Sequence, residues 1–153
     1  KNVLDKKVLL AAEEDTIVNI LDQSGVHTDK YNFTTDFKEC EANGLSIYVK
    51  RESHATDMLC CGFIFECNGE KIYYSGDTSN VPSDILNAFL SGEIKTMYQE
   101  CTFLDTDSTS HFSLKKLCEI IPYEERQRVY CMHLGDDIED DIVKAGFRVP
   151  KIV

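Results

Sequence analysis

Short apolar runs separated by polar turns cover most of this 153-residue chain, and their periods divide them into strands and helices. In the first part of the chain, strand-length runs dominate, and only Glu13–Leu21 has helical spacing, with Gly25 as its stop signal. In the second part, segments with helical spacing alternate with short strands. The expected strands are Lys7–Ala12, Tyr31–Phe37, Leu45–Val49, Leu59–Cys67, Glu70–Ser75, Ile94–Tyr98, Arg128–Met132 and Phe147–Val149, and the expected later helices are Pro82–Leu90, Ser113–Ile121 and Ile138–Ala145.

The Asn68-Gly69 pair separates two β-rich runs and predicts a hairpin, because both turn positions need positive φ angles. The early strands are therefore joined by turns, whereas the later strands alternate with helices. This order predicts an α/β fold in which helices pack on a mixed β-sheet. The length, together with the absence of repeats and linker-like stretches, predicts a single domain over residues 1–153.

The net charge of the chain limits the classes of molecule that it is expected to bind. Sixteen Lys and Arg against 27 Asp and Glu residues give a formal net charge of −11. Such acidity argues against a protein that coats nucleic acid, but it is compatible with a phosphodiester held by metal ions. The short basic patches Lys115–Lys116 and Arg126–Arg128 are expected to be solvated faces or to steer an anionic substrate. The longest apolar stretch, Met58–Phe65, has eight residues, whereas a transmembrane helix needs about 18, so we expect a soluble protein without a membrane segment.

The seven cysteines indicate a reducing compartment. Their number is odd, no CxxC pair occurs, and most of them lie inside apolar runs. A disulfide framework or a cysteine-rich zinc site would have a different spacing. We therefore expect buried free thiols and a cytoplasmic protein.

Three residues that suit metal ions lie beside predicted strands. Asp77 follows the strand of the KIYYSGDTS segment, His133 follows another strand, and His54 lies just before the predicted hairpin. Open α/β sheets bind ligands outside the carboxyl ends of their strands, so these positions indicate a site. Imidazole and carboxylate groups suit zinc, iron or manganese, and a carboxylate such as Asp77 can bridge two ions. The alternative for Asp77 is a turn or helix cap beside Thr78 and Ser79.

Two further polar residues could serve the same site. His111 lies in the polar loop STSHFSL and could line the site without touching a metal. Glu100 ends a strand in YQECT, and its carboxylate could orient a nearby histidine; the alternative is a solvated strand terminus. His27 lies in a polar turn and is expected at the surface. No GxSxG elbow and no glycine-rich phosphate loop occurs, so neither serine catalysis nor nucleotide cradling is supported.

Together these segments resemble the C-terminal half of metallo-β-lactamase-fold hydrolases, above all the branch of ribonuclease Z and related phosphodiesterases. The resemblance runs from His54 through GFIFECNGEKIYYSGDT, QECT and SHFSL to YCMHL and covers nearly the whole chain. It implies the C-terminal portion of an αββα sandwich. It also implies that His54, Asp77 and His133 are metal ligands and that Asp77 bridges two ions.

In the ribonuclease Z branch, a Glu and a His in EAT-like and HST-like segments assist the leaving group. Glu100 and His111 look similar, with Cys101 and Phe112 in the variable positions. The resemblance therefore assigns catalysis to Glu100 and His111 together with Asp77.

The HxHxDH signature of that family, which supplies most ligands of the first metal, does not occur in this chain. Lys1–Gly25 resembles the segment that follows this signature. The resemblance thus implies the C-terminal portion of a longer domain, through truncation, proteolysis, a natural split with a second chain, or a natural short form. An incomplete sandwich exposes an apolar sheet face, so we also expect a tendency to form homo-oligomers.

The function that the resemblance implies is hydrolysis of a phosphodiester, either a small molecule or nucleotide or RNA, at a centre with two zinc ions. Iron and manganese are the alternative metals, and esters, thioesters and lactones are the alternative substrates. Two interpretations from other classes remain: a non-catalytic interaction module that keeps the fold, and an α/β binding domain without metal. An HxHxDH signature upstream of Lys1 would favour the enzyme.

Overall fold

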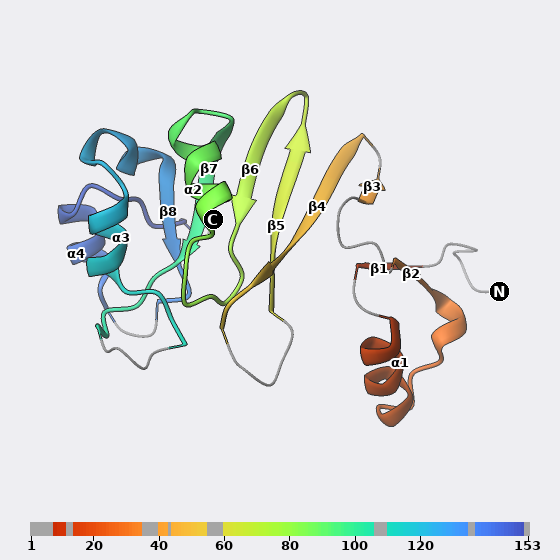
Figure 1. Ribbon diagram of the computed structural model, residues 1–153. Coiled ribbons are helices and arrows are strands. Elements are labelled where there is room, and N and C mark those ends of the chain that lie inside the picture. The colour runs from red at the N-terminus through yellow and green to blue at the C-terminus, as the bar shows by residue number, and fades with distance from the viewer. Residues whose placement is uncertain are drawn as a thin grey trace.

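A six-stranded mixed sheet forms the centre of the computed structural model, which describes residues 8–11, 14–34, 40–42, 44–54, 60–105, 110–134 and 137–151 (Figure 1). Its strand order is β3-β4-β5-β6-β7-β8. Helices follow β6, β7 and β8, with a 3₁₀ helix, Tyr123–Arg128, leading into β8. The bounds are β3 (Cys40–Ala42), β4 (Leu45–Glu52), β5 (Cys60–Cys67), β6 (Glu70–Tyr74), β7 (Ile94–Glu100), β8 (Val129–Met132), α2 (Ser83–Leu90), α3 (Leu114–Ile120) and α4 (Glu139–Lys144).

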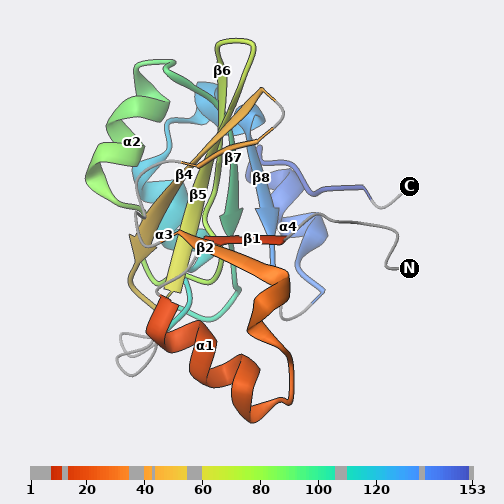
Figure 2. The same cartoon turned by 90° about the vertical axis from the view of Figure 1, so that its right-hand side faces the viewer.

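The N-terminal elements form a separate two-stranded sheet. Strand β1 (Val8–Ala11) pairs in parallel with β2 (Tyr31–Thr34). Helix α1 (Glu14–Gln23) and a short 3₁₀ helix, Thr28–Lys30, connect the two strands. Figures 1 and 2 show this unit beyond the β3 end of the main sheet, away from α2, α3 and α4.

Four strands of the main sheet run in the same direction. Strand β5 is antiparallel to both β4 and β6, whereas β6, β7 and β8 are parallel to one another. Strands β4, β6, β7 and β8 therefore share one direction, and only β5 among these five opposes it. The carboxyl ends of the four strands all lie at the lower edge of the sheet in Figure 1.

The two faces of the sheet differ. Tyr73, Met97 and Val129 are paired across β6, β7 and β8, so their side chains share one face, and they are buried in one apolar cluster with residues of the helices. The next row, Tyr74, Tyr98 and Tyr130, therefore lies on the opposite face, where Tyr98 and Tyr130 stack with ring centroids 4.9 Å apart. Helix residues buried in the cluster are Ile85, Phe89, Leu117 and Ile142.

Two arginines bind the ends of the helices. The Arg126 guanidinium donates to the carbonyls of Cys118, Ile121 and Ala145 at 2.7, 3.0 and 2.9 Å, at the C-terminal ends of α3 and α4. These bonds satisfy carbonyl groups that a helix end leaves without partners. The Arg128 guanidinium donates to the Phe89 carbonyl at 2.8 Å and lies over the Phe89 ring. The expectation that Arg126–Arg128 is a solvated or steering patch is therefore wrong for these two side chains, which hold the helical layer together.

The α/β class and the mixed sheet with helices packed on it are confirmed. The predicted strand Phe147–Val149 is wrong. Of its residues, only Arg148 pairs with β8: its carbonyl accepts from the Cys131 amide and its amide donates to the Val129 carbonyl. Pro150 then lacks the amide hydrogen that would continue the ladder. Strand β3 and the 3₁₀ helix before β8 were not expected. Cys60, Cys61, Cys67, Cys101, Cys118 and Cys131 are free thiols. Residues 7, 12, 35–37 and 59 of the predicted strands lie outside the described residues.

Among the helices that the structure describes, none has the length and apolar character required to cross a membrane.

The buried Phe89 ring offers a test of this core. We expect Phe89→Ala to lower the free energy of unfolding by about 3–5 kcal/mol, because it opens a cavity under Arg128. The neighbouring Leu90 is 39% exposed, so Leu90→Ala should cost only about 0.5 kcal/mol. Urea denaturation of both variants measures the difference, and equal losses would contradict this packing.

Candidate metal centre

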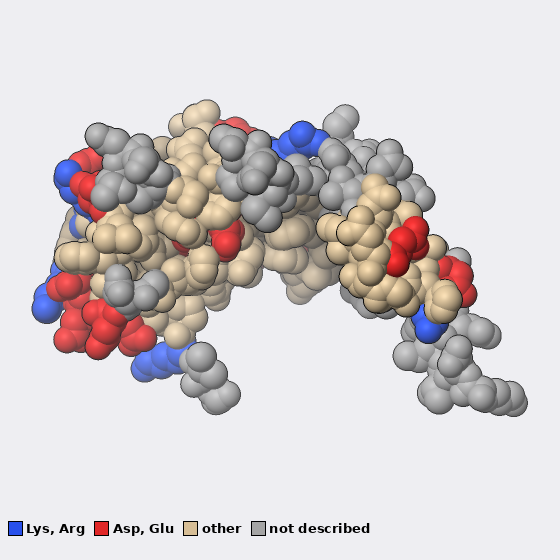
Figure 3. Space-filling view, turned by 90° about the horizontal axis from the view of Figure 1, so that it is seen from below, with Lys and Arg blue, Asp and Glu red and all other residues tan. Residues whose placement is uncertain are grey.

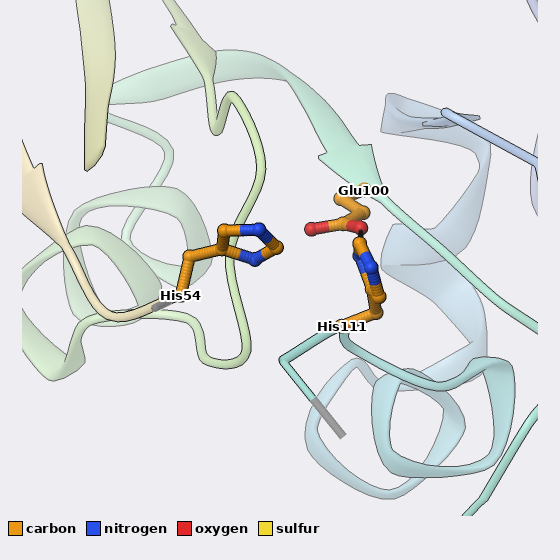
Figure 4. Close-up of side chains that lie close together, drawn as sticks. All are labelled: His54, Glu100 and His111. Carbon is orange, nitrogen blue, oxygen red and sulfur yellow. Dashed lines mark hydrogen bonds and ion pairs between the residues drawn. The ribbon is translucent and has the colours of Figure 1, made fainter. Parts of the chain in front are cut away.

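Five polar side chains meet at the edge where the four parallel strand ends lie. His54 follows β4, Asp77 follows β6, Glu100 is the last residue of β7, and His133 directly follows β8. His111 comes from the segment before α3. Figure 4 shows the His54 ring pointing toward the Glu100 carboxylate from the left, with the His111 ring directly below that carboxylate. The structure therefore brings together every residue to which the sequence assigned a metal or catalytic role. His27 lies exposed beside the N-terminal 3₁₀ helix, as expected.

Glu100 is at the centre of this group. Its side chain is 1% exposed, so the alternative of a solvated strand terminus is wrong. Its backbone amide donates to Ser75 Oγ at 2.9 Å, and the Thr78 amide donates to its Oε2. The other oxygen, Oε1, contacts His111 Nδ1 and lies 3.2 Å from His133 Nδ1. One buried carboxylate thus orients two imidazole rings.

His54 is held by a backbone carbonyl. Its Nδ1 lies 2.7 Å from the carbonyl oxygen of Ser110. A carbonyl only accepts hydrogen bonds, so Nδ1 carries the proton and the Nε2 lone pair is left to bind a metal. The His54 and His111 ring centroids are 4.9 Å apart.

Asp77 and His133 form the more open side of the site. His133 Nδ1 lies 3.2 Å from Asp77 Oδ1, and both side chains are about half exposed. His133 adopts a positive φ of 56°, a conformation that costs a non-glycine residue of the order of 1 kcal/mol and that occurs often at functional sites. The turn before Asp77 also needs a positive φ, which Gly76 supplies at 61°.

The donor set fits metal ions. Two groups of three have all their ligand atoms within 4.8 Å of one another, namely His54, Glu100 and His111, and Asp77, Glu100 and His133. Two ligands of a tetrahedral zinc ion with bonds of 2.0–2.1 Å lie about 3.3 Å apart, close to the 3.2 Å that separates His133 Nδ1 from each of its two carboxylate oxygens. The His133–Glu100 contact is a hydrogen bond, and His133 and Asp77 form an ion pair when the imidazole is protonated. Glu100 belongs to both groups, which joins them into one centre.

The sequence did not identify the residues that hold the loop after β6. The Ser53 carbonyl accepts hydrogen bonds from the Ser79 amide at 2.5 Å, from Ser79 Oγ at 2.7 Å and from Thr78 Oγ1 at 3.3 Å. Thr78 and Ser79 therefore stabilise the turn, while the Asp77 carboxylate is turned toward His133. The polar run SGDTS directly after an apolar strand is the signal that could have indicated this network.

Gly76 should be intolerant of substitution for a steric reason. A Cβ at Gly76 would lie 2.5 Å from the Cys61 carbonyl oxygen, whereas a Cβ at Gly92, which also has a positive φ, would meet nothing within 4 Å. Both alanine variants carry the same backbone strain, so we expect Gly76→Ala to cost about 2 kcal/mol more than Gly92→Ala in urea denaturation. Equal costs would show that the turn relaxes away from β5.

A family model described as "Anti-Pycsar protein Apyc1" matches residues 11–149 of the chain. Two curated relatives carry the same description. The protein of Bacillus phage BSP38 is 33% identical over 97 residues, which cover 61% of this chain and 35% of the relative. The protein of Bacillus phage 010DV004 is 34% identical over 80 residues, which cover 50% of this chain and 28% of the relative. The chain thus spans about a third of the length of the curated relatives that it matches.

Solved structures share the fold. The metallo-β-lactamase fold protein YhfI from Bacillus subtilis has a TM-score of 0.68 and 15% identity, with 98% of this chain and 63% of YhfI covered. A diphosphatase of the PhnP family has a TM-score of 0.65 and 13% identity over 94% of this chain and 56% of its own. The short form of human tRNase Z has a TM-score of 0.58 and 16% identity, with 86% of this chain and 62% of the tRNase covered. These likenesses confirm the metallo-β-lactamase fold.

Proposed function

Since the chain belongs to the Anti-Pycsar protein Apyc1 family, we propose that it carries the C-terminal part of the active centre of a metal-dependent phosphodiesterase. The observation that carries this proposal is the buried Glu100 carboxylate, which links His111 and His133 at the carboxyl ends of parallel strands. Side chains that converge at the carboxyl ends of strands in this way are typical of a ligand-binding or catalytic site in an open α/β sheet. The names of two structural neighbours, a diphosphatase and a tRNase, support phosphate chemistry.

We assign the metal-holding role to His54, Asp77 and His133, with two zinc ions as the expected complement and iron or manganese as alternatives. When bound, two such ions would activate water and neutralise charge that develops on a phosphate. The Asp77 carboxylate lies in one donor group with His133, and Glu100, which belongs to both groups, fixes the His133 ring. These three residues do not saturate two ions, so we propose that sequence outside this chain supplies further ligands, as the absent HxHxDH signature implies.

His111 is the proposed general acid. Its Nδ1 faces Glu100, which as a carboxylate only accepts, so Nδ1 carries a proton and Nε2 is the atom that exchanges a proton with the substrate. The His111 side chain is 40% exposed, whereas Glu100 is buried. A buried carboxylate stabilises the charged imidazole before it gives up its proton to the leaving oxygen.

Metal ions are also needed for electrostatic reasons. The chain carries a net charge of −11 and a phosphodiester is an anion, so the protein's own field repels the substrate. Figure 3 shows the strand-end edge from below, with acidic side chains gathered over the helical end, where α4 carries Glu139, Asp140 and Asp141 in its first turn. Cations at the centre would reverse this field locally.

Glu100 and His111 in QECT and SHFSL support a leaving-group acid like that of the ribonuclease Z branch, and small nucleotides or RNA are the proposed substrates. Esters, thioesters and lactones are the other substrate classes, and a non-catalytic interaction module is the alternative function. The free thiols of the described cysteines support a reducing cytoplasm.

Substitutions separate the proposed roles in the complete polypeptide that the gene encodes. We expect Asp77→Asn to lose bound metal, measured by inductively coupled plasma mass spectrometry, and to lower phosphodiester hydrolysis at least about 1,000-fold, because the metals and their charge neutralisation are lost. His111→Gln should keep its metal and lower the rate about 100- to 10,000-fold. Bis-p-nitrophenyl phosphate, a cyclic mononucleotide and a short oligoribonucleotide serve as substrates.

The exposed His27 provides the matched control, and His27→Gln should change neither metal content nor rate. Wild-type activity in Asp77→Asn would rule out the metal assignment. A polypeptide without metal and without hydrolysis of any of the three substrates would favour the interaction module.

A further inference from the structure

A single hydrogen bond spans three strands beneath the candidate metal centre. Glu52 is the last residue of β4, two positions before His54, and Tyr73 lies in β6, four positions before Asp77. The Tyr73 hydroxyl donates to Glu52 Oε1 at 2.6 Å. Strand β5 lies between β4 and β6 in the sheet, so this bond joins two strands that are not neighbours.

Gly62 on β5 opens the path for this bond. A Cβ at Gly62 would lie 2.8 Å from Glu52 Oε1 and 2.9 Å from the carbonyl oxygens of Tyr74 and Ser75. These separations are too short for any side chain, and Gly62 is not among the glycines with a positive φ. The glycine is therefore needed for space, because its missing side chain lets the Glu52 carboxylate cross the strand.

The pair is poorly suited to a purely stabilising role. Tyr73 is fully buried, and Glu52 Oε2 is buried without a hydrogen-bond partner. Replacing buried polar groups of this kind by apolar ones is often neutral or stabilising. Their presence beside the site therefore indicates a role in geometry.

A second connection lies directly beyond the first. The Ser53 carbonyl, between Glu52 and His54, accepts the bonds from Thr78 and Ser79 that hold the loop after Asp77. Hydrogen bonds thus connect β4 to β6 at two places. The Glu52–Tyr73 bond joins the strands themselves, and the Ser53 bonds join the segments that follow them. These two strands carry donors of different groups, since His54 belongs to one and Asp77 to the other.

We propose that the Glu52–Tyr73 hydrogen bond is a positioning tether, which fixes the end of β4 that carries His54 against the loop that carries Asp77. The consequence for metal binding rests on the proposed function, because the tether would set the spacing between the two groups of donors. Neither residue belongs to the two groups of metal donors, so both are positioning residues.

The test compares tyrosine-to-phenylalanine variants of the complete polypeptide that the gene encodes. Tyr73→Phe removes only the hydroxyl of the tether. Tyr48→Phe is the matched control, because the Tyr48 hydroxyl also contacts a carboxylate across strands, Glu66 Oε2 at 3.4 Å, and lies toward the other end of β4. Glu52→Gln keeps an acceptor oxygen for the Tyr73 hydroxyl, so this variant should behave like the wild type.

Amide hydrogen exchange rates, measured by NMR on the metal-free polypeptide, report directly on whether the tether is intact. The Ser79 amide donates to the Ser53 carbonyl, whereas the Ile142 amide in α4 donates to the carbonyl of Ile138, just before the helix, and serves as the reference for global stability. We expect Tyr73→Phe to speed exchange at Ser79 at least about 10-fold relative to Ile142. Tyr48→Phe and Glu52→Gln should leave this ratio within about threefold of wild type. An unchanged ratio in Tyr73→Phe would overturn the tether.

Zinc titration of the same variants measures the effect of the tether on metal affinity. Residues behind metal ligands typically change metal affinity 10- to 100-fold, so we expect Tyr73→Phe to weaken zinc binding about 10-fold, with Tyr48→Phe unchanged. Unchanged zinc affinity together with faster Ser79 exchange would overturn the effect on the centre. A complete wild-type polypeptide that binds no zinc would count against the proposed function, and the exchange ratio would still decide the tether.

Discussion

The common direction of β4, β6, β7 and β8 is the constraint on which the candidate site depends. Residues that follow parallel strands meet at one edge of a sheet, however far apart they lie in the sequence. His54, Asp77, Glu100 and His133 are contributed in this way, one by each strand. The hairpin strand β5 reverses the chain so that β4 and β6 can point the same way, which makes the hairpin as important to the site as the strands that carry its donors.

Glu100 shows what this convergence requires. Desolvating a carboxylate costs several kcal/mol, and only hydrogen bonds and nearby positive charge offset that cost. Here the Thr78 amide, His111 and His133 surround the carboxylate, so each partner is held in place by the same buried group. The loop after β6, the segment before α3 and the end of β8 therefore depend on one another through a single side chain. A change at any of them should alter the others.

The sequence predicted the mixed sheet, the hairpin and the strand-end positions of Asp77 and His133, because strand periodicity and turn residues act locally. It did not predict the burial of Glu100, since a polar residue at a strand end looks the same whether solvent or two histidines surround it. The Glu52–Tyr73 bond was also out of reach, because it depends on register across three strands and on the space at Gly62. The false strand at Phe147–Val149 has the opposite cause: local apolar character indicated a strand, and Pro150 prevented the pairing.

The hairpin turn at Asn68 and Gly69 has a further consequence for the tolerance of the chain to insertions. This turn and the Gly92 turn before β7 lie at the amino-terminal ends of β6 and β7, opposite the edge where the donors meet. A Cβ at either glycine would contact nothing within 4 Å. Extra loops, affinity tags or whole inserted modules at these turns would leave strand direction and register intact. The metal donors and the turns that tolerate insertions thus lie at opposite ends of the strands. Either end can change in sequence while the other is kept.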